Sequence, residues 1–184
     1  MIEHVLAFLK EQLNSYIRVK TGARFEVVFL QERNQKGVSF QNDAITTVLV
    51  NLEEDYTFRS GAVIERMPSQ GNTSPINPHI HLNLYILFAV NFADYRQSLQ
   101  FLSLIIKFFQ SHRLFNHKNS PTLHADIEKL ILELVNLPFT ERAALGVSYM
   151  PSVIYKVRMV VFTDTDTVET DSDVVAREIQ TVNI

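Results

Sequence analysis

A run of fourteen residues, 79–92, constrains the fold more than any other part of the chain. Its even-numbered positions from 80 to 90 hold only Ile, Leu, Phe or Val, while the odd-numbered row begins polar at His79 and is apolar by Leu87 and Ala89. Because side chains of a strand alternate between the two faces of a sheet, this pattern predicts a strand. The run becomes apolar on both faces toward its end, which indicates a central strand. Helices should cover one face of this strand, and a later part of the chain should cover the other.

Two segments have the three- and four-residue apolar spacing of helices. The first, 2–19, should end at Gly22. The second, 95–109, follows Asp94, a residue type that commonly caps a helix N-terminus. Its apolar stripe of Tyr95, Leu99, Leu102, Ile106 and Phe109 is broadened by Phe101, Ile105 and Phe108, so we expect this helix to be nearly buried.

Further strands are expected at 25–30, 44–52, 114–116 and 153–162, with a polar, turn-prone stretch at 32–37. Segment 125–137 alternates like a strand, and a helix is the open alternative there. Pro138 and Thr140 should introduce a short helix that ends at Ala144. Since strands and helices interleave without a βαβ rhythm, the sequence predicts an α+β fold: a single domain with a mixed, mainly antiparallel sheet packed by helices.

Composition narrows the function classes. The chain has 184 residues and a formal net charge of −3, so bulk electrostatics favours neither nucleic acid nor an anionic membrane as a partner. It has no cysteine, which excludes disulfides, thiolate nucleophiles and zinc–thiolate sites. No cationic segment precedes an apolar one at Met1, and no apolar run approaches the ~20 residues of a membrane helix. We therefore expect synthesis and assembly in the cytoplasm.

Candidate catalytic groups are few. His79 and His81 would lie on one side of a strand, where a small metal-dependent enzyme could use them, but no nearby carboxylate completes a metal site. The acidic trio 53–55 lacks the spaced oxygen ligands of a calcium loop and is interpreted as a solvated turn. All five glycines are isolated, so no phosphate loop is present. The sequence therefore predicts no catalytic residue, no cofactor and no metal.

The chain continues beyond the final strand with an acidic segment. Residues 163–184 contain six acids against Arg177, a net charge of −5, which leaves +2 for the rest of the chain. After residue 173 the apolar content rises again, in a pattern able to add a strand to another chain's sheet. We therefore divide the chain into a domain at 1–163 and an acidic C-terminal arm at 164–184. The arm's expected assembly contacts are Val174, Val175, Ile179, Val182 and Ile184.

Several strings resemble one known family in both content and order. They are TVLVNLEED at 47–55, LNLYILFAVNF at 82–92, Tyr95 with Leu99, FFQ at 108–110 with Phe115, and LGVSYMPSVIYKVRM at 145–159. Together they resemble the tail-terminator, or cap, family of extracellular contractile injection systems, the phage-tail-like particles of the antifeeding-prophage and virulence-cassette type. The resemblance covers the chain from its first helix to about Phe162, and most of these strings are interpreted as core, residues 149–162 among them.

The resemblance implies a non-enzymatic structural protein. Members of the family assemble as a ring, expected to be a hexamer, that caps and terminates the inner tube and the sheath of the particle. The implied partners are further copies of this chain, the inner-tube protein and the sheath protein, and the particle is released from the cell. A position as an adaptor ring beneath a separate cap is the alternative within the same particle.

Two segments bear on how such a ring would form. Family members often carry an aromatic or polar segment before the Leu-Gly pair at 145–146, whereas this chain has the short stretch 140–144. Closed rings use heterologous contacts, which an extended arm helps to close. The arm should therefore dock as a strand on a neighbouring ring or sheath subunit, and the Pro- and Ser-containing loop 67–78 is a second candidate contact.

Overall fold

A computed structural model describes the protein at residues 1–22, 27–29, 31–33, 37–56, 80–136, 138, 145, 147 and 149–162. Between residues 31 and 39 it describes the backbone alone. Several expectations lie outside these residues: the loop 67–78, the short helix at 140–144, and the arm at 164–184.

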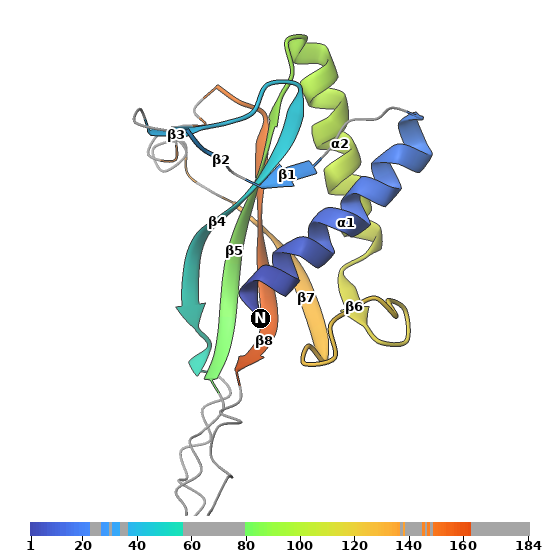
Figure 1. The fold of residues 1–184 in the computed structure, drawn as a ribbon, viewed down its shortest axis with the longest axis vertical. Coiled ribbons are helices and arrows are strands. Elements are labelled where there is room, and N and C mark those ends of the chain that lie inside the picture. Colours follow the sequence, from blue (N-terminus) through green and yellow to red (C-terminus); the bar gives the residue numbers. More distant parts are fainter. Residues whose placement is uncertain are drawn as a thin grey trace, which may run out of the picture.

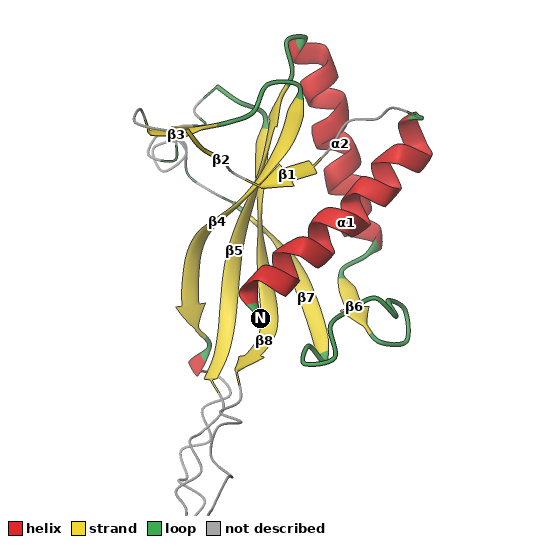
Figure 2. Ribbon diagram, in the orientation of Figure 1, coloured by secondary structure: helices red, strands yellow, loops and turns green. Residues whose placement is uncertain are grey.

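A six-stranded sheet forms the centre of the domain (Figure 2). The strand order is β1 (Val27–Phe29), β4 (Ala44–Glu54), β5 (Ile80–Asn91), β8 (Ser152–Phe162), β7 (Lys129–Val135) and β6 (Leu114–Asn116). β1 pairs with β4 in parallel, and the other neighbours pair antiparallel. The predicted mixed, mainly antiparallel sheet of an α+β fold is confirmed, and β5 is central as its pattern indicated.

The structure adds to the sequence prediction of strands in two places, at residues 31–39 and at residues 125–137. The prediction of a turn-prone stretch at 32–37 was incomplete, because β2 (Gln31–Arg33) and β3 (Gly37–Ser39) pair antiparallel as a separate two-stranded sheet. Segment 125–137 contains the strand β7, and its described residues include no helix. The alternating residues Leu130 and Leu132 of this strand pack into the core. The strand interpretation there is confirmed.

Helix α1 (Ile2–Thr21) begins and ends as its sequence predicts. Its buried residues recur at helical spacing on one face, and they are Val5, Phe8, Leu9, Leu13 and Ile17. Gly22 ends the helix with φ of 63°, and its N–H donates to the carbonyl of Arg18. The side chain of Asn14 accepts a 2.7 Å hydrogen bond from the N–H of Val27, which fixes the short edge strand β1 beside the helix.

Helix α2 (Tyr95–Ser111) is capped by Asp94, whose carboxylate accepts a 2.9 Å hydrogen bond from the N–H of Arg96. Its buried apolar residues are Phe101, Ile105, Phe108 and Phe109. The prediction that this helix is nearly buried was wrong, because Tyr95 is 61% exposed and Leu99 is 43% exposed. The apolar stripe is wider than the area that the sheet and α1 cover.

Both helices pack on one face of the sheet, where the main core lies (Figure 1). The apolar row of β5 supplies Leu84, Ile86, Phe88 and Val90 to this core. Phe88 packs against Phe109 of α2 with ring centroids 5.2 Å apart. The aromatic side chains Phe101, Phe108 and Phe109 of α2 and Phe115 after it are all buried in the core.

The opposite face of the sheet, here called the open face, is covered over one end by a smaller apolar cluster. Leu87 and Ala89 of β5 belong to it, together with Val147 and Ile154. This cluster explains why β5 becomes apolar on both faces toward its end. The other end of the open face carries charged side chains.

Candidate assembly surfaces

The residues expected to make assembly contacts lie in the arm, and all five are outside the described residues. His79 is outside them as well, while His81 lies near the start of β5. In the described part of the chain, no group of three or more His, Asp or Glu side chains is placed to hold a metal ion. Neither described helix is sufficiently long and apolar to cross a membrane.

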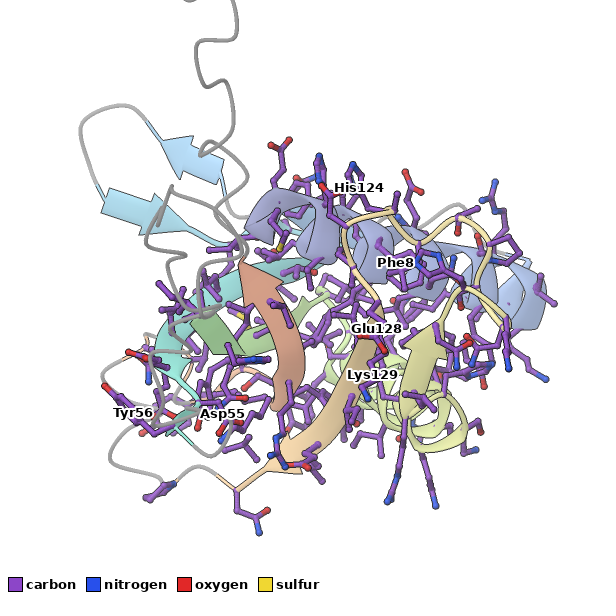
Figure 3. The ribbon with its side chains drawn as sticks, turned by 90° about the horizontal axis from the view of Figure 1, so that it is seen from below. Phe8, Asp55, Tyr56, His124, Glu128 and Lys129 are labelled. Atoms are coloured by element: carbon purple, nitrogen blue, oxygen red, sulfur yellow. The ribbon has the colours of Figure 1, made fainter. Side chains whose placement is uncertain are left out.

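The acidic trio 53–55 is not the solvated turn that the sequence suggested. Glu53 and Glu54 end the strand β4, and Asp55 follows it with a side chain only 9% exposed. Figure 3 views this end of the sheet and labels Asp55 beside Tyr56. The N–H of Asp55 donates a 2.7 Å hydrogen bond to the carbonyl of His81, so the end of β4 stays attached to β5. The acids face basic residues that come from distant parts of the chain.

Charged and polar groups of four strands form a row across the open face, here called the charge ladder. Its members are Glu53 on β4, Asp55 just after β4, Tyr85 on β5, Lys156 and Arg158 on β8, and Glu133 on β7. The strand register creates this row, because Lys156 lies opposite both Tyr85 and Glu133. Sequence reasoning missed the ladder because it depends on how strands far apart in the chain are arranged in the sheet, which leaves no local pattern.

Hydrogen bonds shift the pKa values of two ladder residues. The Tyr85 hydroxyl donates a 2.6 Å hydrogen bond to Glu53 Oε2, which raises the pKa of Tyr85, and partial burial adds to that shift. The hydrogen bond from Arg158 Nη1 to Glu133 Oε1, at 3.2 Å, raises the pKa of Arg158. The ladder thus pairs charged and polar groups from four neighbouring strands of the sheet.

A groove lies at the opposite end of the sheet, where β5 leads into α2 and the chain enters β8. It has a volume of about 440 Å³ and is lined chiefly by apolar groups. These include Val90, Phe92, Tyr95, Tyr149, Met150 and Pro151. The interpretation of residues 149–162 as core was therefore wrong at its start, because Tyr149 is 90% exposed. We call this feature the tyrosine groove.

Backbone hydrogen bonds hold the tyrosine groove in shape. The N–H of Val90 donates to the carbonyl of Pro151 at 2.9 Å, which joins the two walls. The N–H of Phe92 donates to the hydroxyl of Ser98 at 3.1 Å, which fixes the turn into α2. A tyrosine two residues before a proline, just ahead of a strand, is the one local signal in the sequence that could have indicated this exposed aromatic residue.

Comparison with known proteins identifies the relatives of this fold. The model of the Pvc16 N-terminal domain family matches residues 4–176. No curated protein matches the chain. A cryo-EM structure of an extracellular contractile injection system, the PVC sheath/tube terminator in its extended state, shares the fold with a TM-score of 0.56 and 16% sequence identity. That likeness covers 97% of this chain and 70% of the other. The resemblance inferred from the sequence strings is thereby confirmed, and the chain belongs to the Pvc16 N-terminal domain family.

Proposed function

We propose that this chain is a structural subunit of a contractile injection particle, in which it terminates the inner tube and the sheath. The family match across residues 4–176 carries the proposal. The fold shared with the PVC sheath/tube terminator supports it, because the likeness extends over 97% of the chain rather than over one motif. The particle is extracellular, and the subunit joins it during assembly in the cytoplasm.

The subunit forms a ring, which we take to be a hexamer around the tube. A ring requires one surface of each subunit to contact a different surface of the next. The protein offers two unlike surfaces at opposite ends of its sheet: the charge ladder and the tyrosine groove. No catalytic role is assigned, because the charged groups of the ladder pair with one another across the strands.

The arm at 164–184 is the part of the chain that reaches a neighbouring ring or sheath subunit. Its first ten residues, 164–173, contain five acidic side chains and no basic one, so they supply a charged spacer. The apolar residues that follow give it a contact surface, namely Val174, Val175, Ile179, Val182 and Ile184. The folded domain at 1–163 then serves as the body of the ring.

Particle length tests the proposal. Cells that make the particle without this chain should yield tubes and sheaths of irregular length in electron micrographs, because growth has no terminator. Restoring the full chain should restore a uniform length, and restoring residues 1–163 alone should not. A second variant changes the five apolar arm residues to Ser while the acidic spacer is kept; it should behave like the truncated chain. Particles of normal length and sheath content without the chain would contradict the proposed function.

A further inference from the structure

The tyrosine groove is an apolar recess that the described residues line without filling. Its floor includes Val90 and Phe92, which are buried, and its rim carries Tyr95 and Tyr149, which are 61% and 90% exposed. Leu99 follows one helical turn after Tyr95 and extends the apolar surface along α2 with 43% of its area exposed. Large exposed aromatic groups around an apolar floor are typical of sites that anchor a partner's side chains.

The polar groups beside the groove already have partners. The Ser98 hydroxyl accepts the N–H of Phe92, and the Asn91 side-chain amide donates to Asn42 Oδ1 at 3.0 Å. Few polar groups therefore remain to orient a charged small molecule. The surface instead fits aliphatic side chains presented by an extended peptide.

The charge of helix α2 indicates what kind of peptide would bind in the groove. Helix α2 contains Arg96 and Lys107 and no acidic residue, and both basic side chains lie on its exposed surface. The carboxylate of Asp94 is engaged in capping the helix. A segment that approaches the groove along α2 thus meets a basic surface, which attracts an acidic spacer. The arm of this protein combines such a spacer with an aliphatic end.

The positions of the groove and the arm determine which copy supplies the peptide. Strand β8 begins beside the groove at Ser152 and ends at Phe162, at the other end of the sheet (Figure 1). Eleven residues of β8 span roughly 36 Å, and the ten-residue spacer at 164–173 reaches about the same distance only when fully extended. To fill its own groove, the arm would have to reverse direction and run back along its own sheet without slack. A neighbour placed head to tail presents its groove without that reversal.

We infer that the tyrosine groove of each subunit receives the apolar end of the arm, residues 174–184, from an adjacent copy of this chain. The inference rests on the proposed function and extends it by assigning the receiving surface. The contact is heterologous, since an arm meets a groove, and repetition of such a contact closes a ring when the rotation between neighbours divides a full turn. Tyr95 and Tyr149 enclose the aliphatic side chains, and Arg96 lies where the acidic spacer passes.

Cysteine cross-linking tests the assignment, because the natural chain has no cysteine. One full-length chain carries the substitution Tyr149→Cys. A second full-length chain carries a single cysteine in the arm, which replaces Val174, Ile179 or Val182 in three separate variants. A disulfide forms only when the two Cα atoms come within about 7 Å, so mixing under mild oxidation reports direct contact. Lys118→Cys is the matched control, since Lys118 is also exposed but lies in the loop after β6, away from the groove.

We expect at least about ten-fold more disulfide-linked heterodimer with Tyr149→Cys than with Lys118→Cys for at least one arm position, because docking raises the local concentration of the two thiols. Equal yields of heterodimer with Tyr149→Cys and with Lys118→Cys would overturn the inference. A chain with both cysteines that forms only an intramolecular disulfide would overturn it as well, in favour of docking within one subunit. Near-native circular dichroism and thermal unfolding of each variant serve as the folding check.

The experiments distinguish a failure of the groove assignment from a failure of the proposed function. If no arm position cross-links to the groove, yet loss of the chain still produces particles of irregular length, the groove assignment is wrong and the terminator function stands. If particles are normal without the chain, the function itself is wrong, whatever the cross-linking shows.

Discussion

Arg158 and Asp55 are 103 residues apart in the sequence, and Nη2 of Arg158 donates a 3.4 Å hydrogen bond to Oδ2 of Asp55. The contact crosses β5, which lies between β4 and β8 in the sheet. Arg158 also contacts Glu133 at 3.2 Å, so one guanidinium joins three separate segments of the chain. Because the Asp55 side chain is only 9% exposed, Arg158 compensates a carboxylate that has lost most of its contact with water.

Replacing Arg158 should destabilise the domain more than replacing its neighbour on the same face. We expect Arg158→Met to lower the free energy of unfolding by about 1–3 kcal/mol, since it leaves the mostly buried Asp55 without its cation. Lys156→Met is the control: its 4.0 Å contact is with a half-exposed Glu53, and such pairs contribute about 0–1 kcal/mol. Urea unfolding measures both variants, and equal losses would contradict this account of the ladder.

The Tyr85–Glu53 hydrogen bond predicts a specific loss of stability at alkaline pH. The pKa of Tyr85 is raised in the folded protein, first by that hydrogen bond and then by burial. The unfolded chain therefore releases the phenolic proton first, so the stabilisation is complete below about pH 10 and falls as pH rises further. Tyr85→Phe should show a shallower decline in urea midpoint between pH 9 and 11 than the natural chain. Tyr155, whose pKa burial also raises, is common to both proteins and cancels in the comparison.

Helix α2 has an inner and an outer apolar face, and mutations should distinguish them. Ile105 is fully buried in the main core, so Ile105→Ala should cost about 2–5 kcal/mol. Leu99 is one of the exposed apolar residues, and Leu99→Ala should cost less than about 1 kcal/mol. Both changes leave alanine, the best helix former, so propensity cannot explain the difference. Similar losses in thermal unfolding would mean that the outer face is covered in the isolated protein.

Gly22 offers a test of backbone conformation with little interference from packing. Its φ is +63°, and a Cβ added there would meet nothing within 4 Å. Gly22→Ala should therefore destabilise by about 1 kcal/mol through the left-handed conformation alone. Gly22→Asn should recover part of that loss, because asparagine tolerates this conformation better than alanine. Denaturant midpoints of the two variants provide the measurement, and an alanine variant as stable as the natural chain would be the contrary result.

The spacing of residue types along short segments was sufficient to predict the elements whose structure depends on neighbouring residues. The alternation of β5, the cap at Asp94 and the stop at Gly22 are each determined within a few residues, and each is confirmed. Alternation at Leu130 and Leu132 also favoured the strand that is found in β7.

Features that depend on tertiary pairing were not predicted. The acidic trio looked solvated because its partner Arg158 is remote in sequence. Tyr149 looked like core because it precedes an apolar strand, although the chain turns before β8 and leaves its ring in solvent. Tyr95 and Leu99 continue an apolar stripe whose outer part nothing in the described structure covers. These failures share one cause, since burial is decided by which elements pack together rather than by the residue itself.

The central claim is that this chain terminates the tube and sheath, and its location in the particle tests that claim most directly. Cryo-electron microscopy of intact particles, with this chain tagged at an exposed position such as Lys118, can show where the subunit lies. The account predicts a single ring of tagged subunits at one end, in contact with the last layer of tube and sheath. Tag density repeated along the length of the particle, or absent from both ends, would contradict it.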